Sequence, residues 1–262
     1  MSIKEFVEPV PTATLPPRPV ERMKQRVVRL PRRRPAGRAL LLQGADLAPV
    51  AALAAPVAAL AEVLRAGAVE PIIVRIERGT QLPDPGSLEL AVVIGPARWS
   101  GNPSRADDAA QVDWLREANR AGTPVLAVGT ASQLLATALG GGFERARRPR
   151  HGWVDVTTTA PKLIAPGPWL AWEDTVIRLP RQAKLLAHDR VGPQAFRVNQ
   201  QIGVQFHPEA TPQLVTDWVA NSDAALDHQG IMEATWRDQT PAADASRQLF
   251  TSFVRSAIRR PR

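Results

Sequence analysis

Short apolar runs alternate with longer periodic segments along the first half of this chain. Residues 38–43, 71–76, 88–94 and 125–128 are mainly apolar runs, which is the pattern of buried strands. Between them, apolar residues recur every three or four positions, as in helices with one buried face. These helical segments are 47–66, 112–121 and 132–139, and each is followed by a glycine that can end a helix.

The alternation predicts an α/β fold in which a doubly wound, mostly parallel sheet is flanked by helices. Ligand sites in such sheets lie at the carboxyl ends of the strands. Pro56 falls inside the first helical segment, so we expect a kink or a break there. The sequence contains no visible repeat of 20–50 residues, which argues against a solenoid or a propeller.

The pattern changes after residue 150, where shorter strand candidates are separated by turns. They are 153–159, 175–178, 184–187, 195–198 and 202–206, and they predict a small β-rich layer. Thr211-Pro212 predicts the start of a helix over 212–221, because proline is favoured at the first helical position. A last helix is predicted over 242–258, whereas the polar stretch 227–240 has no clear pattern.

Composition narrows the function classes. The chain of 262 residues has 44% hydrophobic residues and no cysteine, which excludes disulfides, thiolate metal sites and a cysteine nucleophile within it. No apolar run reaches the length of a membrane span, and the N-terminus lacks the apolar region of a signal peptide. We therefore expect a cytoplasmic protein, and nothing in the sequence calls for a cofactor or a metal.

The net charge of +8 is concentrated at the N-terminus. Residues 1–38 carry ten Lys and Arg against three Glu, which leaves +1 for the other 224 residues. We predict a disordered Pro/Arg-rich basic tail over 1–37 and a single domain over 38–262. The run Arg32-Arg33-Arg34 suits contact with nucleic acid or an acidic partner, although such runs are commonly just solvated. Equal binding by a chain without residues 1–37 would exclude the tail as the contact.

The segment 124–141 organises the rest of the chain. A buried strand, one turn residue and a helix form the geometry of a nucleophile elbow, in which the turn residue is strained and presents its side chain at the end of the sheet. The turn residue here is Gly129, which has no side chain. Glycine adopts positive φ at little cost, so this elbow has the shape of a catalytic turn without its nucleophile.

His207 and Glu209 follow the strand candidate 202–206. Residues two apart on an extended backbone point to the same side, so the carboxylate can orient the imidazole and stabilise its protonated form. Taken alone, a histidine beside a carboxylate is more often structural than catalytic.

Several motifs in order make the combination specific. The elbow is followed by Gly152-Trp153, Trp169-Leu-Ala-Trp172, Asp174-Thr175, Gln194-Ala-Phe196 and Gly203-Val-Gln-Phe-His-Pro-Glu209. This series, over about 38–218, resembles the class I glutamine amidotransferases, in particular the stand-alone type related to the glutaminase domain of GMP synthase. The resemblance implies a flavodoxin-like glutaminase fold and a Cys-His-Glu triad that releases ammonia from glutamine through a thioester, with His207 as base and Glu209 as its orienting carboxylate.

Four departures from the family pattern cluster where glutamine would bind. Gly129 occupies the nucleophile position, and both glycines that flank the family's cysteine are alanines, Ala127 and Ala131. The strand before the oxyanion loop ends in Gly95-Pro96, one glycine short of the family's Gly-Gly-Pro. The family's Trp-His-Gly-Asp is here Trp172-Glu173-Asp174. We therefore count Gly95, Thr130, Gln133, Trp172 and Glu173 as residues of the altered pocket.

Three functions remain open at this point. The first is a catalytically inactive glutaminase homologue that acts as a binding, regulatory or partner subunit, for instance of a synthase, and that holds a small amide or amino acid. The second is a hydrolase or amidotransferase with residual or different chemistry, in which His207, oriented by Glu209, activates a water molecule. Thr130 and Ser132 are the candidates for a replacement nucleophile. The third is binding of nucleic acid or an acidic protein through the tail.

Overall fold

The computed structural model describes residues 37–44, 60–67, 69–76, 80–95, 106–222 and 226–258. All of them belong to one unit of the chain, Arg33–Arg262. The predicted tail over 1–37 lies outside the described residues except for Gly37, and so does the break expected at Pro56. Of the first predicted helix only 60–66 are described, and they are helical.

The described strands form one nine-stranded sheet with a parallel and an antiparallel half. The parallel half runs, in spatial order, through β2 (Val69–Ile76), β1 (Gly37–Gly44), β3 (Leu90–Ile94), β4 (Val125–Val128) and β9 (Gln201–Val204). The antiparallel half continues through β8 (Pro193–Val198), β7 (Lys184–His188), β5 (Gly142–Thr158) and β6 (Gly167–Arg178). The doubly wound, mostly parallel sheet is as predicted, whereas the β-rich strands, which were expected to form a small layer, continue that same sheet.

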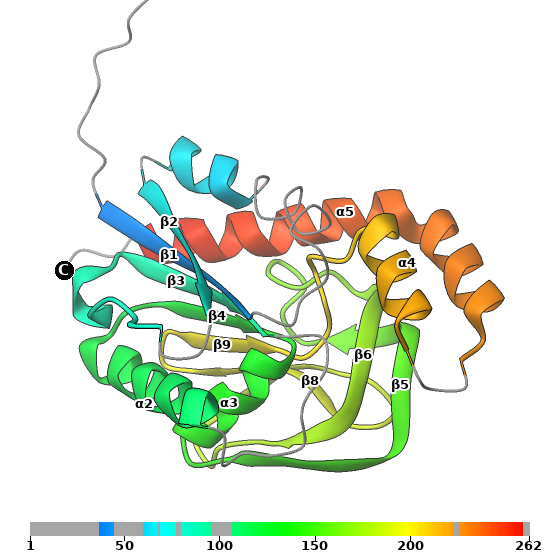
Figure 1. The fold of residues 1–262 in the computed structure, drawn as a ribbon, viewed down its shortest axis with the longest axis horizontal. Helices are drawn as coiled ribbons and strands as arrows, with labels where there is room; N and C mark the ends of the chain where they lie inside the picture. The colour runs from blue at the N-terminus through cyan, green and yellow to red at the C-terminus, as the bar shows by residue number, and fades with distance from the viewer. Residues whose placement is uncertain are drawn as a thin grey trace, which may run out of the picture. The chain divides into compact units, whose positions relative to one another are not determined.

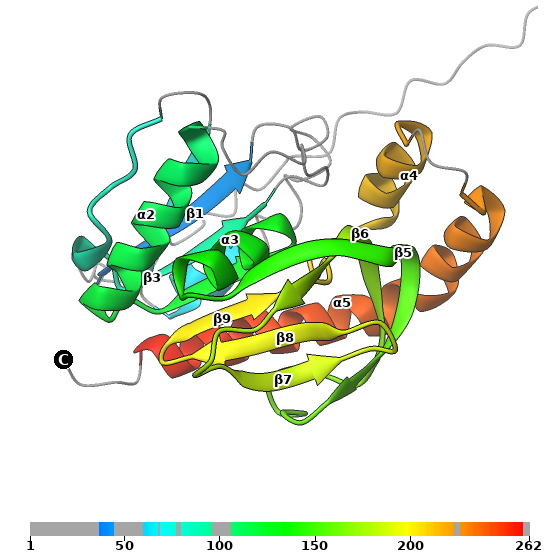
Figure 2. The same ribbon diagram turned by 90° about the horizontal axis from the view of Figure 1, so that it is seen from below.

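Helices cover both faces of the parallel half. Helices α2 (Ala106–Ala121) and α3 (Thr130–Ala138) lie on one face, and α5 (His228–Ile258) and the helical segment 60–66 lie on the other (Figures 1 and 2). Helix α4 (Pro212–Ala220) packs beside the first half of α5, and a short 3-10 turn, η1 (Pro85–Ser87), precedes β3. No helix in the described ranges is long and apolar enough to cross a membrane.

The central strands β3 and β4 bury side chains on both faces. In β3, Leu90, Val92 and Ile94 pack with α5 and the 60–66 segment, whereas Ala91 and Val93 pack with α2 and α3. Burial on both faces explains why these strands read as continuous apolar runs in the sequence.

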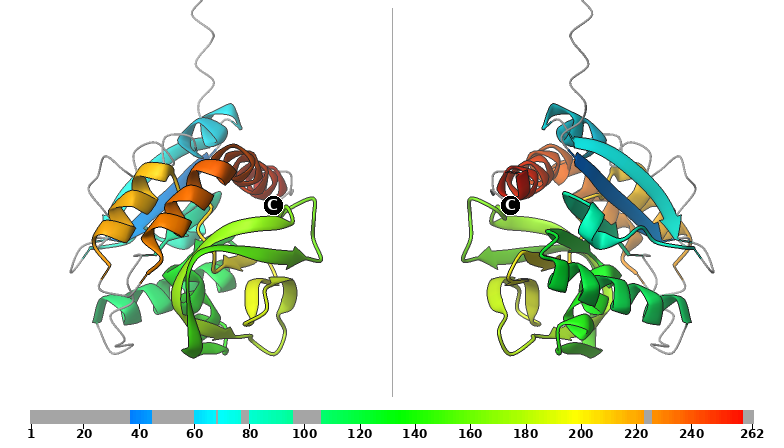
Figure 3. Two further views of the ribbon diagram at one scale, coloured as in Figure 1. Left: turned by 90° about the vertical axis from the view of Figure 1, so that its right-hand side faces the viewer. Right: turned by 90° about the vertical axis from the view of Figure 1, so that its left-hand side faces the viewer.

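The β5–β6 hairpin is much longer than the strand candidates at 153–159 and 175–178. Its two strands form a long curved ribbon at one end of the sheet (Figure 3). The pairing register shifts between Arg145 and Arg150, and exposed charged residues in between interrupt any alternation. The sequence pattern therefore missed the first half of β5, because a bulge hides the period of two.

Helix α5 begins at His228, well before the predicted 242–258, and passes through Pro241. Its first half is held by tertiary contacts rather than by its own pattern. Ile231 and Thr235 are buried, and the indole N–H of Trp153 on β5 donates to the hydroxyl of Thr235 at 2.9 Å. Helix α2 also begins earlier than predicted, at Ala106, whereas α4 begins as predicted, with the hydroxyl of Thr211 accepting the N–H of Leu214.

Candidate functional site

Three neighbouring parallel strands end at the same edge of the sheet. Gly95 follows β3, Gly129 follows β4, and His207 lies three residues beyond the end of β9. Because parallel strands place their carboxyl ends together, the topology brings these residues to one site. The sequence-predicted elbow and dyad therefore do meet.

The elbow has the backbone of a strained turn. Gly129 has φ +60° and ψ −128°, a region that glycine adopts far more readily than other residues. Its N–H donates to the carbonyl of Val204 at 2.9 Å, which ties the turn to β9. The hydroxyl of the buried Ser132 donates to the carbonyl of Gly129 at 2.7 Å, so this side chain braces the turn from the first turn of α3.

His207 and Glu209 form a buried dyad. Their Nδ1 and Oε1 atoms are 2.8 Å apart, and both side chains are almost fully shielded from solvent. The N–H of His207 donates to the carbonyl of Leu170 on β6 at 2.8 Å, which fixes the segment after β9. The second oxygen of Glu209 is buried and has no hydrogen-bond partner among the described residues.

The ring of His207 occupies the space beside Gly129. A Cβ atom placed on Gly129 would lie 2.6 Å from Cε1 of His207, which is closer than packed atoms approach, and 3.3 Å from its Nδ1 and Nε2. On another side, the ring meets Trp218 of α4 edge-on, with ring centroids 4.7 Å apart. The turn thus lacks a side chain, and the imidazole fills the volume that a side chain would need.

The charge of His207 is stabilised by its neighbours. Burial lowers the pKa of His207, but the carboxylate of Glu209, the more distant Glu173 and the backbone carbonyl of Trp172 together raise it above its ordinary value. The imidazole is therefore biased towards its protonated form, in which both ring nitrogens are donors and neither can accept a proton.

Glu173 lies in a buried polar cluster that the sequence pattern did not predict. Its Oε1 accepts the side-chain amide of Gln194 at 3.0 Å and lies 3.2 Å from the guanidinium of Arg150, which also pairs with Asp189 at 3.0 Å. Burial raises the pKa of Glu173 to about 7, although Arg150 acts in the opposite direction. The sequence offers no sign that Arg150, among the exposed arginines of β5, is the buried one.

The other predicted pocket residues surround the elbow. The N–H of Gly95 donates to the carbonyl of Val128 at 3.0 Å, and a Cβ on Gly95 would collide with the backbone nitrogen of Ala131. Thr130 is half-buried at the start of α3, and Gln133 is buried one turn further on. Pro96, which was expected to alter the oxyanion loop, lies outside the described residues.

Trp172, the last of the predicted pocket residues, packs against two other rings. Trp172 is buried between Trp218 and His151, and its ring centroid is 5.6 Å from that of Trp218 and 5.2 Å from that of His151.

Among the described residues, no group of three or more His, Asp and Glu side chains has the spacing of a metal site.

Comparison with known proteins identifies the fold and the family. The family profile described as Glutamine amidotransferase class-I matches residues 91–222, which is half of the chain and includes the elbow, the dyad and Glu173. The chain belongs to the class I glutamine amidotransferase family. Its glutaminase-type fold is shared with a glutamine amidotransferase from Thermotoga maritima, at a TM-score of 0.68 and 18% identity over 83% of this chain and 98% of that one.

Proteins similar in sequence to this chain include GMP synthases. The chain is 29% identical over 159 residues to the glutamine-hydrolyzing GMP synthase of Gloeothece citriformis, covering 57% of this chain and 29% of that protein. It is 33% identical over 99 residues to one subunit of the glutamine-hydrolyzing GMP synthase of Sulfurisphaera tokodaii, covering 34% of this chain and 53% of that subunit. In both cases the match spans well under two thirds of the relative.

Proposed function

We propose that this chain is a glutaminase-fold protein that does not hydrolyse glutamine and acts as a binding, regulatory or partner subunit. One observation carries the proposal. The turn residue aimed at His207 is Gly129, and the imidazole lies where its side chain would be, 2.6 Å from the Cβ position. Amide cleavage through an acyl intermediate needs an activated nucleophile, and this turn offers neither the nucleophile nor room for one.

The expected loss of glutamine turnover can be estimated from the behaviour of catalytic triads. Removing the nucleophile of a triad lowers turnover by on the order of 10⁶, and what remains comes from binding and the oxyanion hole. That remainder is smaller here, because the N–H of Gly95 is already bonded to Val128.

The neighbouring hydroxyl residues are poor replacements for the missing nucleophile. Ser132 is fully buried and its hydroxyl donates to the carbonyl of Gly129, so it faces the backbone rather than a substrate. Thr130 is half-buried and is the first residue of α3, one position beyond the turn residue that faces His207. The intact His207–Glu209 pair is the feature that keeps a water-activating hydrolase as the alternative function.

The partner role is supported by the kind of relatives the chain has. One of them carries the name of a subunit of GMP synthase, so a protein related to it is a candidate to meet a synthase subunit even if it makes no ammonia. By this reasoning the protein binds a synthase-type partner, and the buried polar cluster around Glu173 replaces part of the former glutamine pocket. A small amide or amino acid remains the class of ligand to test there.

A covalent probe of the nucleophile tests the proposal. The glutamine analogue 6-diazo-5-oxo-L-norleucine alkylates a nucleophile that is aligned with the amide site, and intact-mass spectrometry detects the adduct. We expect no mass increase in the full-length protein. A stoichiometric adduct that maps to Thr130 or Ser132 would replace the proposal with an enzyme that uses a hydroxyl nucleophile.

A further inference from the structure

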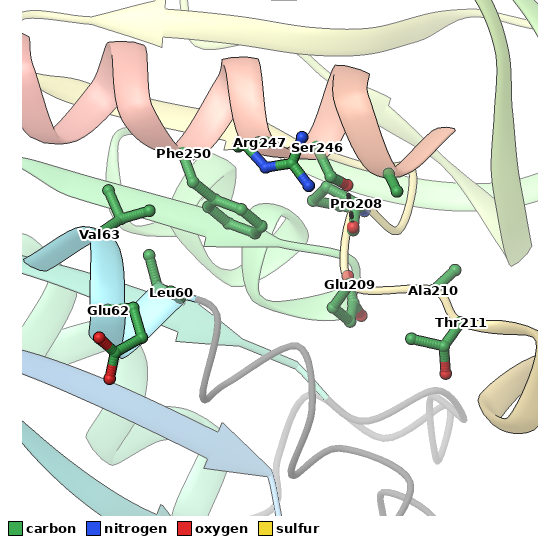
Figure 4. Close-up of a pocket in the computed structure, with 11 residues that line it drawn as sticks. Leu60, Glu62, Val63, Pro208, Glu209, Ala210, Thr211, Ser246, Arg247 and Phe250 are labelled. Atoms are coloured by element: carbon green, nitrogen blue, oxygen red, sulfur yellow. Dashed lines mark hydrogen bonds between the residues drawn. The ribbon is translucent and has the colours of Figure 1, made fainter. Parts of the chain in front are cut away.

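A cavity of about 470 Å³ lies on the face of the sheet covered by α5. It is bounded by the helical segment 60–66, the segment Pro208–Thr211 that carries Glu209, and the second half of α5 (Figure 4). This volume is within the range of cavities that hold small-molecule ligands, about 300–1,000 Å³. Neither Gly129 nor His207 lines this cavity.

The lining is mainly apolar. Leu60 and Val63 come from the 60–66 segment, Phe250 and Ala243 from α5, and Ala210 from the segment after the dyad. Two of the polar lining groups are already hydrogen-bonded within the protein: the hydroxyl of Ser246 donates to the carbonyl of Pro208, and the hydroxyl of Thr211 accepts the N–H of Leu214. A ligand that fills this space therefore needs an apolar body of one or two rings or an equivalent chain.

A cation in the lining is placed to recognise a charged group on that body. Figure 4 shows the guanidinium of Arg247 above the space between Phe250 and Pro208, with the carboxylate of Glu62 at the edge, away from both. Glu62 is paired with Arg65 at 2.8 Å. Arg247 is paired with the exposed Asp244, and such surface pairs are weak enough for a ligand anion to compete.

We propose that this cavity binds a small apolar molecule bearing one anionic group, with the body against Phe250 and Leu60 and the anion on Arg247. The site goes beyond the proposed function, because it does not use the elbow or the imidazole. The side chain of Glu209 is fully buried and bonded to His207, so a ligand would touch the Pro208–Thr211 segment without needing the dyad.

Two matched fluorescent probes test the site on the full-length protein. 8-Anilinonaphthalene-1-sulfonate has an apolar body with one sulfonate, and N-phenyl-1-naphthylamine has the same body without charge. Fluorescence titration should give one site for each. Ala243→Trp, which places a large side chain on an exposed lining position, should weaken both probes at least tenfold.

The charge is tested by Arg247→Glu. It should weaken the sulfonate probe about tenfold and leave the neutral probe within twofold. Arg237→Glu is the matched control, because Arg237 lies on the same helix, has the same 68% side-chain exposure and pairs with Asp238, but does not line the cavity. Unchanged binding of both probes to the Ala243→Trp variant overturns the site. Equal effects of Arg247→Glu and Arg237→Glu on the sulfonate probe overturn the anionic part.

Discussion

At the scale of single residues, Gly129 is held by two separate constraints. Its backbone is in the left-handed region, and its missing side chain leaves room for the ring of His207. The first constraint is what a nucleophile elbow requires of any residue, whereas the second is particular to this arrangement. The two can be separated by comparing Gly129 with Gly140, which has φ +87° and no atom within 4 Å of the position that a Cβ would take.

We predict that Gly129→Ala destabilises the protein more than Gly140→Ala does. Backbone strain costs both variants about 1–3 kcal/mol, and only Gly129→Ala must also displace the imidazole. Urea denaturation of both variants measures the difference. In a His207→Ala background the excess cost at position 129 should disappear, and equal costs in the wild-type background would contradict the close packing.

The raised pKa of Glu173 leads us to predict that the stability of the protein falls as the pH rises. The pKa of Glu173 is raised from 4.5 to about 7 in the folded protein. The protonated carboxyl group therefore contributes fully to the free energy of unfolding below pH 4.5, and this contribution is lost as the pH rises through 7. Glu173→Gln removes this titration while Asp189 still pairs with Arg150. The variant should therefore gain stability relative to wild type between pH 4.5 and 8, by about 3 kcal/mol.

Denaturation series at pH 4.5, 6 and 8 would measure this gain. Glu144→Gln is the control, since Glu144 is an exposed carboxylate on the paired strand β5. A stability difference between wild type and Glu173→Gln that stays constant with pH would show that folding does not raise the pKa of this carboxyl group.

At the scale of elements, helix α5 depends on a contact that its own sequence does not reveal. Its first half has a weak apolar pattern and contains Pro241, yet it is helical from His228. Thr235 is buried there, and its hydroxyl donates to Ile231 while it accepts the indole N–H of Trp153. The hairpin β5–β6 thus helps to set where α5 begins.

We predict that Thr235→Val destabilises the protein by about 1–2 kcal/mol, because the partly buried indole N–H of Trp153 loses its acceptor. Thr216→Val is the matched control. Thr216 lies on α4, is exposed, and makes the same kind of hydroxyl bond to the carbonyl four residues earlier. Thermal unfolding of both variants gives the comparison, and equal losses would mean that the contact with Trp153 adds nothing.

At the scale of the whole molecule, the local patterns predicted most of the sheet and the residues that meet after β4 and β9. The central strands β3 and β4 were readable because both of their faces are buried, and the dyad because His207 and Glu209 are two residues apart after a strand. The cluster of Arg150 and Asp189 around Glu173 was not readable, because it depends on the bulge in β5 and on pairing between distant strands. The position of the His207 ring over Gly129 likewise depends on the packing of Trp218.

The central claim is that the nucleophile position of this glutaminase fold is closed and unable to cleave an amide. The most direct measurement is ammonium release from glutamine labelled with ¹⁵N in its side chain, followed by NMR for the full-length protein and for His207→Ala. We predict no release above the uncatalysed rate and no difference between the two proteins. Release near 1 s⁻¹, within the usual range of enzymes, that is lost in His207→Ala would contradict the claim.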